Sequence, residues 1–197
     1  MIENIIEKIR DIIDLPGVKN KIMLNIGDWY RLCACLDAIE DAQFAIKQYK
    51  NLSNFDAFNG GYLYVYGLLQ ALFLQQDAVN GLSQVLLDKK IDYKEQQYSK
   101  LYEIREIRNN SIGHPTSRSN NSYFGIVRMS LFKKGFSISK HSYEKETDYS
   151  QSTKSKNIVF DDIEVGKIIL IQSKLVKDIL LKIKKKLILN EREKNIG

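Results

Sequence analysis

The near absence of proline is the feature that most constrains how this chain folds. Only Pro16 and Pro115 occur among 197 residues, so the segment 17–114 contains none. Proline breaks a helix interior because its ring clashes with the preceding turn and it lacks a backbone N–H donor. Between the two prolines, apolar residues recur at three- and four-residue spacing, which is typical of amphipathic helices. The sequence therefore predicts a mainly α fold built from long helices.

Apolar residues at helical spacing mark four segments before Pro115, and a fifth follows near the C-terminus. The four segments are 2–13, 28–50, 62–87 and 93–111. Pro16 and Gly17 are expected to end the first helix, and Asp28 is expected to cap the second. The segment 62–87 is the most apolar and predicts the central helix. The fifth helix is expected to begin after a cap at Asp161 or Asp162.

The pattern changes between the fourth and the last helix. Residues 123–132 and 136–143 alternate and are rich in β-branched and aromatic side chains, with a candidate turn at 133–135, so they predict a β-hairpin. The polar segment 144–156 predicts a mobile loop, and the apolar run 158–160 is a candidate third strand. We predict a single domain over 1–197. It is an up-and-down bundle of about five helices with a hairpin and loop insertion at about 118–160.

The net charge of +6 is distributed unevenly along the chain. Residues 1–117 hold 13 Lys/Arg against 15 Asp/Glu, whereas residues 118–197 hold 17 Lys/Arg against 9 Asp/Glu. This excess of cations favours a polyanion or an acidic partner protein near the C-terminal part. The lysines at the end of the last helix also suit the helix dipole, so that cluster does not require a ligand.

The cysteines and the hydropathy indicate the cellular compartment in which the protein is expected. Cys33 and Cys35 lie two residues apart in a helical pattern and therefore point to different faces. Two such thiols make neither a disulfide framework nor a zinc site, which favours a reducing cytoplasm. The chain opens with an amphipathic helix rather than a signal peptide, and no apolar run reaches the roughly 18 residues of a membrane span. We expect a cytoplasmic protein with no membrane partner.

The segment 104–116 contains the main candidates for catalysis or anion binding. On a helical wheel, Arg105 and Arg108 project from the side that is expected to pack, and neither has an acid three or four residues away. A guanidinium on such a face must meet an acid from another helix or line a cleft that receives an anion. Asp77 interrupts an apolar stripe on the central helix and is the candidate acid. An arginine paired with Asp77 would be purely structural.

His114 adds a group that can transfer protons. Gly113 and Pro115 break the helix around it, and histidine titrates near neutrality. Arg108 offers a fork for a phosphate whose charge grows in the transition state, and Asn109 can hold the phosphate or the imidazole. A base that takes the 2′-OH proton, a cation at phosphorus and an acid at the leaving 5′ oxygen suffice to cleave RNA. One histidine cannot easily be both acid and base, which favours two copies that meet across a dimer.

The end of the fourth helix resembles the R-x(4–6)-H signature of the HEPN superfamily. It reads Arg108-Asn109-Asn110-Ser111-Ile112-Gly113-His114. The resemblance covers roughly residues 1–117 and implies an up-and-down helical bundle. It also implies a metal-independent endoribonuclease that leaves a 2′,3′-cyclic phosphate and uses no cofactor. Arg108 and His114 would be its catalytic pair and Asn109 a supporting residue, at a site where the motifs of a homodimer face each other.

The resemblance also implies a biological role and partners. Relatives act in toxin–antitoxin pairs or in defence against phage, so an antitoxin or another regulatory protein is an expected partner beside RNA. Relatives that are silenced by nucleotidyl transfer carry a tyrosine two residues after the histidine, where this chain has Thr116. Two alternatives stay open. One is a catalytically inactive HEPN module that binds RNA, nucleotide or a partner protein. The other is an unrelated helical interaction protein whose arginines are only structural.

Three further cations are predicted to bind substrate. They are Arg105, beside the motif, and Lys133 and Lys134, at the tip of the hairpin. Together with other hairpin cations such as Lys140, they would steer RNA towards the cleft through long-range attraction, which salt weakens. His141 lies on the second hairpin strand, has no partner that the sequence identifies, and is expected at the surface.

Overall fold

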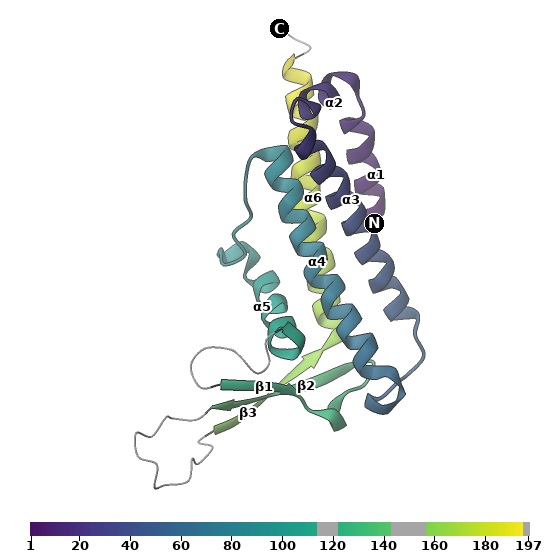
Figure 1. Cartoon of the computed structure of the whole chain (residues 1–197), viewed down its shortest axis with the longest axis vertical. Coiled ribbons are helices and arrows are strands. Elements are labelled where there is room, and N and C mark those ends of the chain that lie inside the picture. The colour runs from purple at the N-terminus through teal and green to yellow at the C-terminus, as the bar shows by residue number, and fades with distance from the viewer. Residues whose placement is uncertain (114–121, 143–156, 195–197) are drawn as a thin grey trace.

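The computed structural model describes residues 1–113, 122–142 and 157–194. Six α-helices in these ranges form an up-and-down bundle, and a three-stranded antiparallel sheet closes one end of it (Figure 1). The prediction of a mainly α fold is confirmed. Among the described helices, none is long and apolar enough to cross a membrane.

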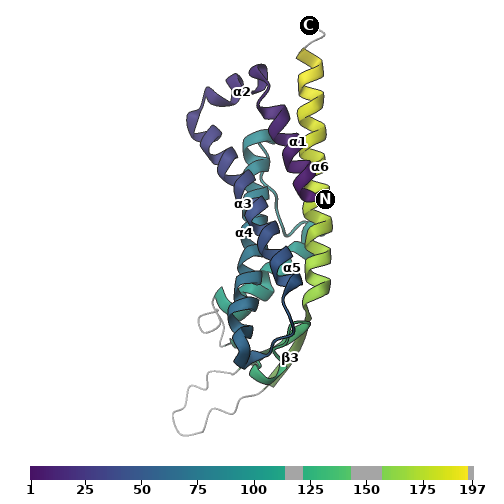
Figure 2. The same cartoon turned by 90° about the vertical axis from the view of Figure 1, so that its right-hand side faces the viewer.

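The bounds of the elements follow the chain in order. The helices are α1 (Ile2–Ile13), α2 (Pro16–Met23), α3 (Ile26–Asn51), α4 (Tyr62–Leu87), α5 (Ser99–Arg108) and α6 (Val165–Lys194). The strands are β1 (Ser122–Ile126), β2 (Gly135–Ser142) and β3 (Asn157–Glu164). Shorter turns are η1 (Ala57–Gly61), η2 (Gln96–Tyr98), η3 (Asn109–Gly113) and η4 (Arg128–Ser130). Helix α6 runs the length of the bundle beside α1 (Figure 2).

Three helix starts before the sheet differ from the prediction, and the first difference is in α5, which begins at Ser99 rather than at 93 because a separate short turn, η2, precedes it. Pro16 ends α1 as expected, but it also begins the short helix α2, because a proline in the first helical position has no N–H bond to lose. Helix α3 begins before the expected cap. Asn25, not Asp28, caps it through a side-chain oxygen that accepts a hydrogen bond from the N–H of Gly27 (3.1 Å), and the Asn25 amide donates to Asp28 (2.8 Å).

The sheet is larger than the predicted hairpin. Strands β1 and β2 pair as expected, although β1 ends at Ile126 and η4 occupies part of the predicted first strand. Strand β3 pairs with β2 along its whole length and extends the candidate strand at 158–160. Asp161 and Asp162 therefore lie inside β3 and do not cap α6. Asp162 is opposite Ser137, whose hydroxyl donates to its carboxylate (2.5 Å). Helix α6 begins at Val165, whose N–H donates to the carbonyl of Lys134 (2.9 Å). The predicted loop 144–156 lies outside the described residues.

A buried glutamine network fixes the position of α5. Gln75, Gln76 and Gln172 are fully buried. The amide of Gln76 donates to Oε1 of Gln172 (2.7 Å) and to the carbonyl of Leu101 on α5 (3.2 Å), and Gln172 donates to the carbonyl of Leu72 on α4 (2.7 Å). A buried amide that loses its partner costs about 1–3 kcal/mol, so the network holds α4, α5 and α6 in one register. Leu101 is one turn before Arg105, and this register therefore positions the candidate site.

Candidate functional site

The candidate site lies where α5 crosses the outer side of α4. Arg105 on α5 contacts Asp77, and Arg108, one turn later, contacts Gln70, two turns earlier on α4. The two helices therefore run antiparallel at this point. Phe73 lies between Gln70 and Asp77 in the sequence of α4, and both guanidinium groups stack on its ring. The stripe that Asp77 interrupts thus faces both arginines.

Arg108 is anchored by neutral groups. Its Nε and Nη2 donate to Oε1 of Gln70 at 3.3 and 3.0 Å, and its Nη1 donates to Oδ1 of Asn109 at 3.2 Å. Its guanidinium carbon is 4.4 Å from the ring centre of Phe73. Within the described ranges, no carboxylate oxygen lies within 4.0 Å of this half-buried cation. Its positive charge is therefore not neutralised by the part of the chain that the structure describes.

Arg105 has a different environment. Its Nη1 is 2.8 Å from a carboxylate oxygen of Asp77, and only 19% of its side chain is exposed. The guanidinium also stacks on Phe73 (4.0 Å) and on Tyr93 (5.3 Å). Burial raises the pKa of Tyr93, whose hydroxyl donates to the carbonyl of Gln76 (2.5 Å), and Arg105 offsets part of this rise. The predicted structural pair of Arg105 with Asp77 is present, and the substrate-binding role of Arg105 stays a prediction.

A π-helical turn follows Arg108. Residues Asn109–Gly113 form η3, where the chain makes a wider turn than in α5, and such turns recur at functional sites. Gly113 packs directly against the arginine, because a Cβ atom at this position would lie 2.5 Å from Nη1 of Arg108. The sequence suggested that Gly113 serves as a helix end. In the structure its role is close approach, since its φ lies outside the left-handed range.

The structure describes two of the three predicted catalytic residues, Arg108 and Asn109. Arg108 and Asn109 are neighbours that share a hydrogen bond, and the Asn109 amide also donates to Glu106 (3.3 Å). His114 lies outside the described residues. Its chain neighbour Gly113 touches the Arg108 guanidinium, so the backbone that leads to His114 starts at the arginine.

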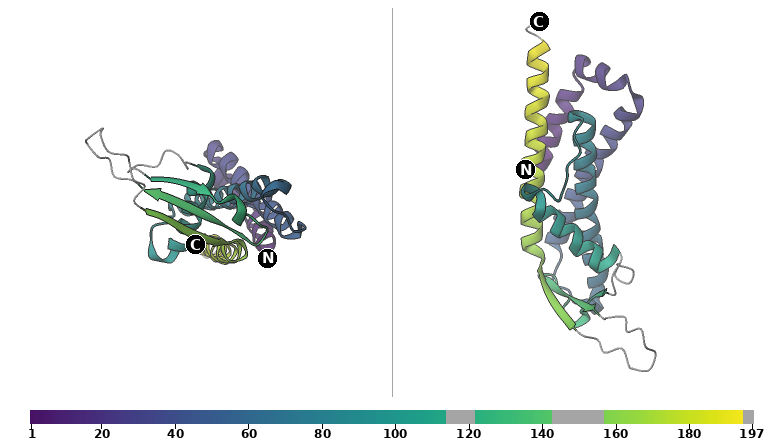
Figure 3. Two further views of the ribbon diagram at one scale, coloured as in Figure 1. Left: turned by 90° about the horizontal axis from the view of Figure 1, so that it is seen from below. Right: turned by 90° about the vertical axis from the view of Figure 1, so that its left-hand side faces the viewer.

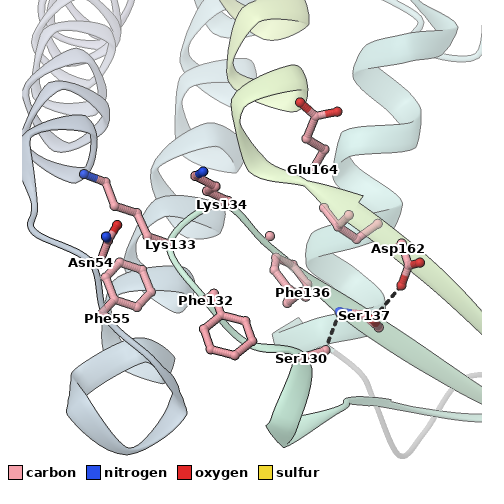
Figure 4. A pocket seen from close by; sticks show the side chains of 12 residues that line it. Asn54, Phe55, Ser130, Phe132, Lys133, Lys134, Phe136, Ser137, Asp162 and Glu164 are labelled. Atoms are coloured by element: carbon pink, nitrogen blue, oxygen red, sulfur yellow. Dashed lines mark hydrogen bonds between the residues drawn. The ribbon is translucent and has the colours of Figure 1, made fainter.

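The hairpin lysines, Lys133 and Lys134, do not contact Arg108 and differ from each other in their surroundings. The ammonium of Lys133 donates to the carbonyl of Leu52 at the end of α3, a position where a cation suits the helix dipole. Lys134 is exposed, and both lysines line a pocket of about 770 Å³. Figure 4 shows Phe132 and Phe136 in the middle of this pocket, with Lys133 on one side and Asp162 on the other. Neither lysine is among the groups that contact Arg108 in the described structure.

A groove of about 1060 Å³ lies on another side of α5, between this helix, the sheet and α6. Its lining contains more acids than cations: Glu103, Glu106, Asp161, Asp162 and Glu164 against Lys100, Lys140 and Lys167. Phosphate groups are repelled by such a surface. The groove therefore does not suit a polyanion, and its size alone does not make it the candidate site.

Sequence reasoning missed two residues of the site. Gln70 lies on the same stripe as Asp77, but an amide on a helix gives no signal of a charged partner. Phe73, also on that stripe, has the sequence pattern of an ordinary apolar residue. The spacing of the residues is the signal that could have found Gln70. Gln70 precedes Asp77 by two helical turns on α4, and Arg105 and Arg108, one turn apart, have to pack nearby.

Comparisons with known proteins leave the family open. No protein-family model, no curated protein and no solved structure gives a significant match to this chain. The functional argument therefore rests on the residues and on the geometry around Arg108.

Proposed function

We propose that this protein is a metal-independent endoribonuclease of the HEPN type, with Arg108, Asn109 and His114 at its catalytic centre. The observation that carries the proposal is the environment of Arg108. Its guanidinium is held in place by Gln70 and Asn109 without a carboxylate among the described residues. An arginine has five N–H donors, and two of those on Arg108 have no partner in the described structure. They are available to an oxygen of the scissile phosphate.

The proposed chemistry divides the roles among these residues. The imidazole of His114 accepts the proton of the 2′-OH, and the 2′ oxygen then attacks the adjacent phosphorus. Arg108 stabilises the growing charge on the phosphate oxygens. A second imidazole, from another copy of the chain, protonates the leaving 5′ oxygen. The products are a 2′,3′-cyclic phosphate and a 5′-hydroxyl. A role in a toxin–antitoxin pair or in phage defence, with an antitoxin as regulator, belongs to this same proposal.

The surface next to Arg108 supports the pairing of two copies. The side of α4 that continues from Gln70 carries an exposed uncharged stripe of Leu63, Tyr66, Gly67 and Leu74. A Cβ atom on Gly67 would meet nothing within 4 Å, so a second helix has space to approach the backbone there. We place the second copy on this stripe, because it runs past Gln70, the residue that holds Arg108.

The central experiment is an RNA cleavage assay in EDTA with a test for a 2′,3′-cyclic phosphate. The substitutions His114→Ala and Arg108→Ala should each lower the rate by at least about 100-fold, in line with the loss of an acid–base group or of an electrostatic donor. Arg31→Ala is the matched control, because Arg31 on α3 also donates to a glutamine oxygen, that of Gln84 (2.5 Å), at a distance from the motif. This variant should keep the wild-type rate.

Two outcomes would support the alternatives. If the wild-type protein leaves RNA intact but shifts it in a salt-dependent way, the chain is a binding module. If RNA is neither cut nor bound, and His114→Ala unfolds the protein, the arginines are structural. The dimer is tested by Leu74→Asp, which should lower both the sedimentation mass and the cleavage rate. Phe44→Asp changes a similarly exposed apolar residue on α3 and should alter neither.

A further inference from the structure

Strand β3 forms one edge of the sheet. The strand order is β1-β2-β3, and β3 pairs with β2 along its whole length. Seen from below, the three strands lie side by side, with β3 on the side of α6 (Figure 3). Among the residues that the structure describes, no strand pairs with the other edge of β3, which is called the free edge below. A free edge presents unpaired backbone N–H and C=O groups and is a template for another strand.

The hydrogen bonds of Ser137 show which backbone groups of β3 point to the free edge. In an antiparallel ladder, the N–H and C=O of one residue point to the same side, and the side alternates from residue to residue. The carbonyl of Ser137 accepts from the N–H of Val127 (2.9 Å) and its own N–H donates to Oγ of Ser130 (2.7 Å), so Ser137 points away from β3. Its partner Asp162 therefore points away from β2. By the same alternation, the residues whose backbone groups point to the free edge are Ile158, Phe160, Asp162 and Glu164.

The groove of about 1060 Å³ beside α5 runs along this free edge. Six consecutive residues of β3, 159–164, line it, although neighbouring side chains of a strand point to opposite faces of the sheet. The groove borders both faces because it extends past the edge of the strand. Its other walls include Ile104 and Ile107 of α5 and Ile168 and Ile171 of α6. The groove therefore has room for an extended chain beside β3.

A chain added to the free edge would have different surroundings on its two faces. Its inward side chains would meet Val159 and Ile163 of β3, across from the isoleucines of α5 and α6. Its outward side chains would meet Phe160, which is 62% exposed, and then the carboxylates of Asp162 and Glu164. The outer face of the three described strands has no lysine or arginine, and the groove itself contains more acids than cations. These surroundings favour apolar residues on the inward side and cations on the outward side.

The charge of the edge argues against a second copy of β3 as the occupant. Strand β3 contains the acids Asp161, Asp162 and Glu164 and no cation. Two such strands paired edge to edge would double the number of carboxylates, and like charges that face each other across a strand pair are destabilising. The same carboxylates repel a nucleic acid. The edge is therefore complementary to an extended segment that carries positive charge.

We propose that the free edge of β3 binds an extended segment of a partner protein, in which basic and apolar residues alternate, as a fourth strand of the sheet. In this mode of recognition, main-chain hydrogen bonds supply the affinity and alternate side chains supply the specificity. The apolar side chains of the segment enter the groove towards α5, and its cations face Asp162 and Glu164. The bound segment contacts α5, the helix that carries Arg108. The interaction goes beyond the proposed RNA cleavage and does not depend on it.

The backbone pairing is tested with a labelled peptide of about seven residues, a typical strand length, in which lysine and valine alternate. Binding is followed by fluorescence anisotropy at low salt. Phe160→Pro removes an N–H that points to the free edge and keeps the ladder with β2, because proline is tolerated in an edge strand when its nitrogen faces outward. Phe160→Ala is the matched control, since it also removes the phenyl ring but keeps the N–H. The proline variant should bind the peptide at least about tenfold more weakly than the alanine variant.

The charge of the edge is tested separately. Asp162→Lys combined with Glu164→Lys should weaken binding of the peptide by at least about fivefold, because two attractive cross-strand pairs become repulsive. The control combines Glu7→Lys on α1 with Asp41→Lys on α3, which makes the same change in net charge at exposed positions away from the sheet. This control should keep the wild-type affinity. Thermal melting checks that each variant is folded.

Several results would overturn the proposal. A folded Phe160→Pro protein that binds the peptide as tightly as Phe160→Ala would show that the edge is not used. Equally tight binding of a peptide in which glutamate replaces lysine would contradict the charge of the partner. A lower sedimentation mass of Phe160→Pro without peptide would make a second copy the occupant. If Phe160→Pro does not fold, the wild-type protein is tested with a peptide methylated at its backbone nitrogens, which should lose binding; unchanged binding would refute the backbone pairing. RNA is absent throughout, so this proposal and the ribonuclease proposal fail independently.

Discussion

Gly113→Ala tests the proposed role of Arg108 without replacing the arginine itself. The new methyl group would lie 2.5 Å from Nη1 of Arg108 and 3.2 Å from Oδ1 of Asn109. Non-bonded carbon contacts are favourable at about 3.5 Å, so the guanidinium must move by roughly 1 Å. A misplacement of about 1 Å at a catalytic group can cost on the order of 100-fold in rate. We therefore expect RNA cleavage by Gly113→Ala to fall by about that factor.

The same substitution should leave the free energy of unfolding nearly unchanged. Arg108 is a flexible side chain, and its movement loses the hydrogen bond to Asn109, which contributes about 0.5–1.5 kcal/mol. Replacement of glycine by alanine in a helical turn recovers about 0.5–1 kcal/mol. The two effects offset each other to within about 1 kcal/mol, so denaturant unfolding should show a small change.

The control and the refuting result are both specific. Gly17→Ala on α2 adds a methyl group where nothing lies within 4 Å, and it should keep the wild-type cleavage rate. The rates are compared under single-turnover conditions in EDTA. If Gly113→Ala cuts RNA as fast as Gly17→Ala does, the observed placement of Arg108 does not matter for cleavage, and the reasoning from its environment is wrong.

Two other changes address the charge of Arg108 and the anchoring of the sheet. Gln70→Glu places a carboxylate against Arg108, so the log–log dependence of RNA affinity on salt should lose about one unit of slope; an unchanged slope would contradict the proposed phosphate contact. Tyr49 on α3 donates its hydroxyl to the carbonyl of Lys133, next to β2 (3.0 Å), and burial raises its pKa to about 12. The folded state keeps this proton more tightly than the unfolded state does, so this stabilisation is complete below pH 10 and is lost as pH rises towards 12. Tyr49→Phe should therefore flatten the alkaline decline in the free energy of unfolding, and an equally steep decline would refute the assignment.

Most of the described helices could be predicted because their apolar spacing is regular and proline is nearly absent, whereas the short helix α2 was not predicted. The bounds of α1 and α4 agree with the sequence pattern, since these helices are amphipathic or apolar throughout. The prediction failed where a tertiary partner decides the structure. Asp161 and Asp162 are good helix caps by type, but pairing with β2 keeps them in a strand. A local sequence pattern does not contain that pairing.

The site was predictable only in part, for a similar reason. Arg105 and Asp77 each interrupt an apolar face, so each signals the need for a partner, and they meet in the structure. Gln70 is uncharged and gives no such signal, although it provides the main anchor of Arg108. The contact of Gly113 with Arg108 depends on the π-helical turn, which the sequence does not indicate.

Asp77→Asn would show how Arg105 and Arg108 differ in their contribution to RNA binding. Their guanidinium carbons are 4.0 and 4.4 Å from the same ring centre of Phe73. The two charges are therefore at most roughly 8 Å apart and repel each other by about 2 kcal/mol or more at an effective dielectric constant near 20. Asp77 neutralises Arg105 and so offsets this repulsion, which leaves Arg108 as the charge that an anion would meet.

Removal of the Asp77 charge should have opposite effects on stability and on RNA binding. The pair is partly exposed, with 47% of the Asp77 side chain accessible, so its loss should lower the free energy of unfolding by only about 1 kcal/mol. Arg105 then lacks a counter-ion beside Arg108, and RNA should bind more tightly, with a salt dependence that is steeper by about one unit. Binding and unfolding are measured on the same preparation. Weaker RNA binding by a folded Asp77→Asn protein would mean that Asp77 positions the site, and that the cation pair on Phe73 does not attract the phosphate.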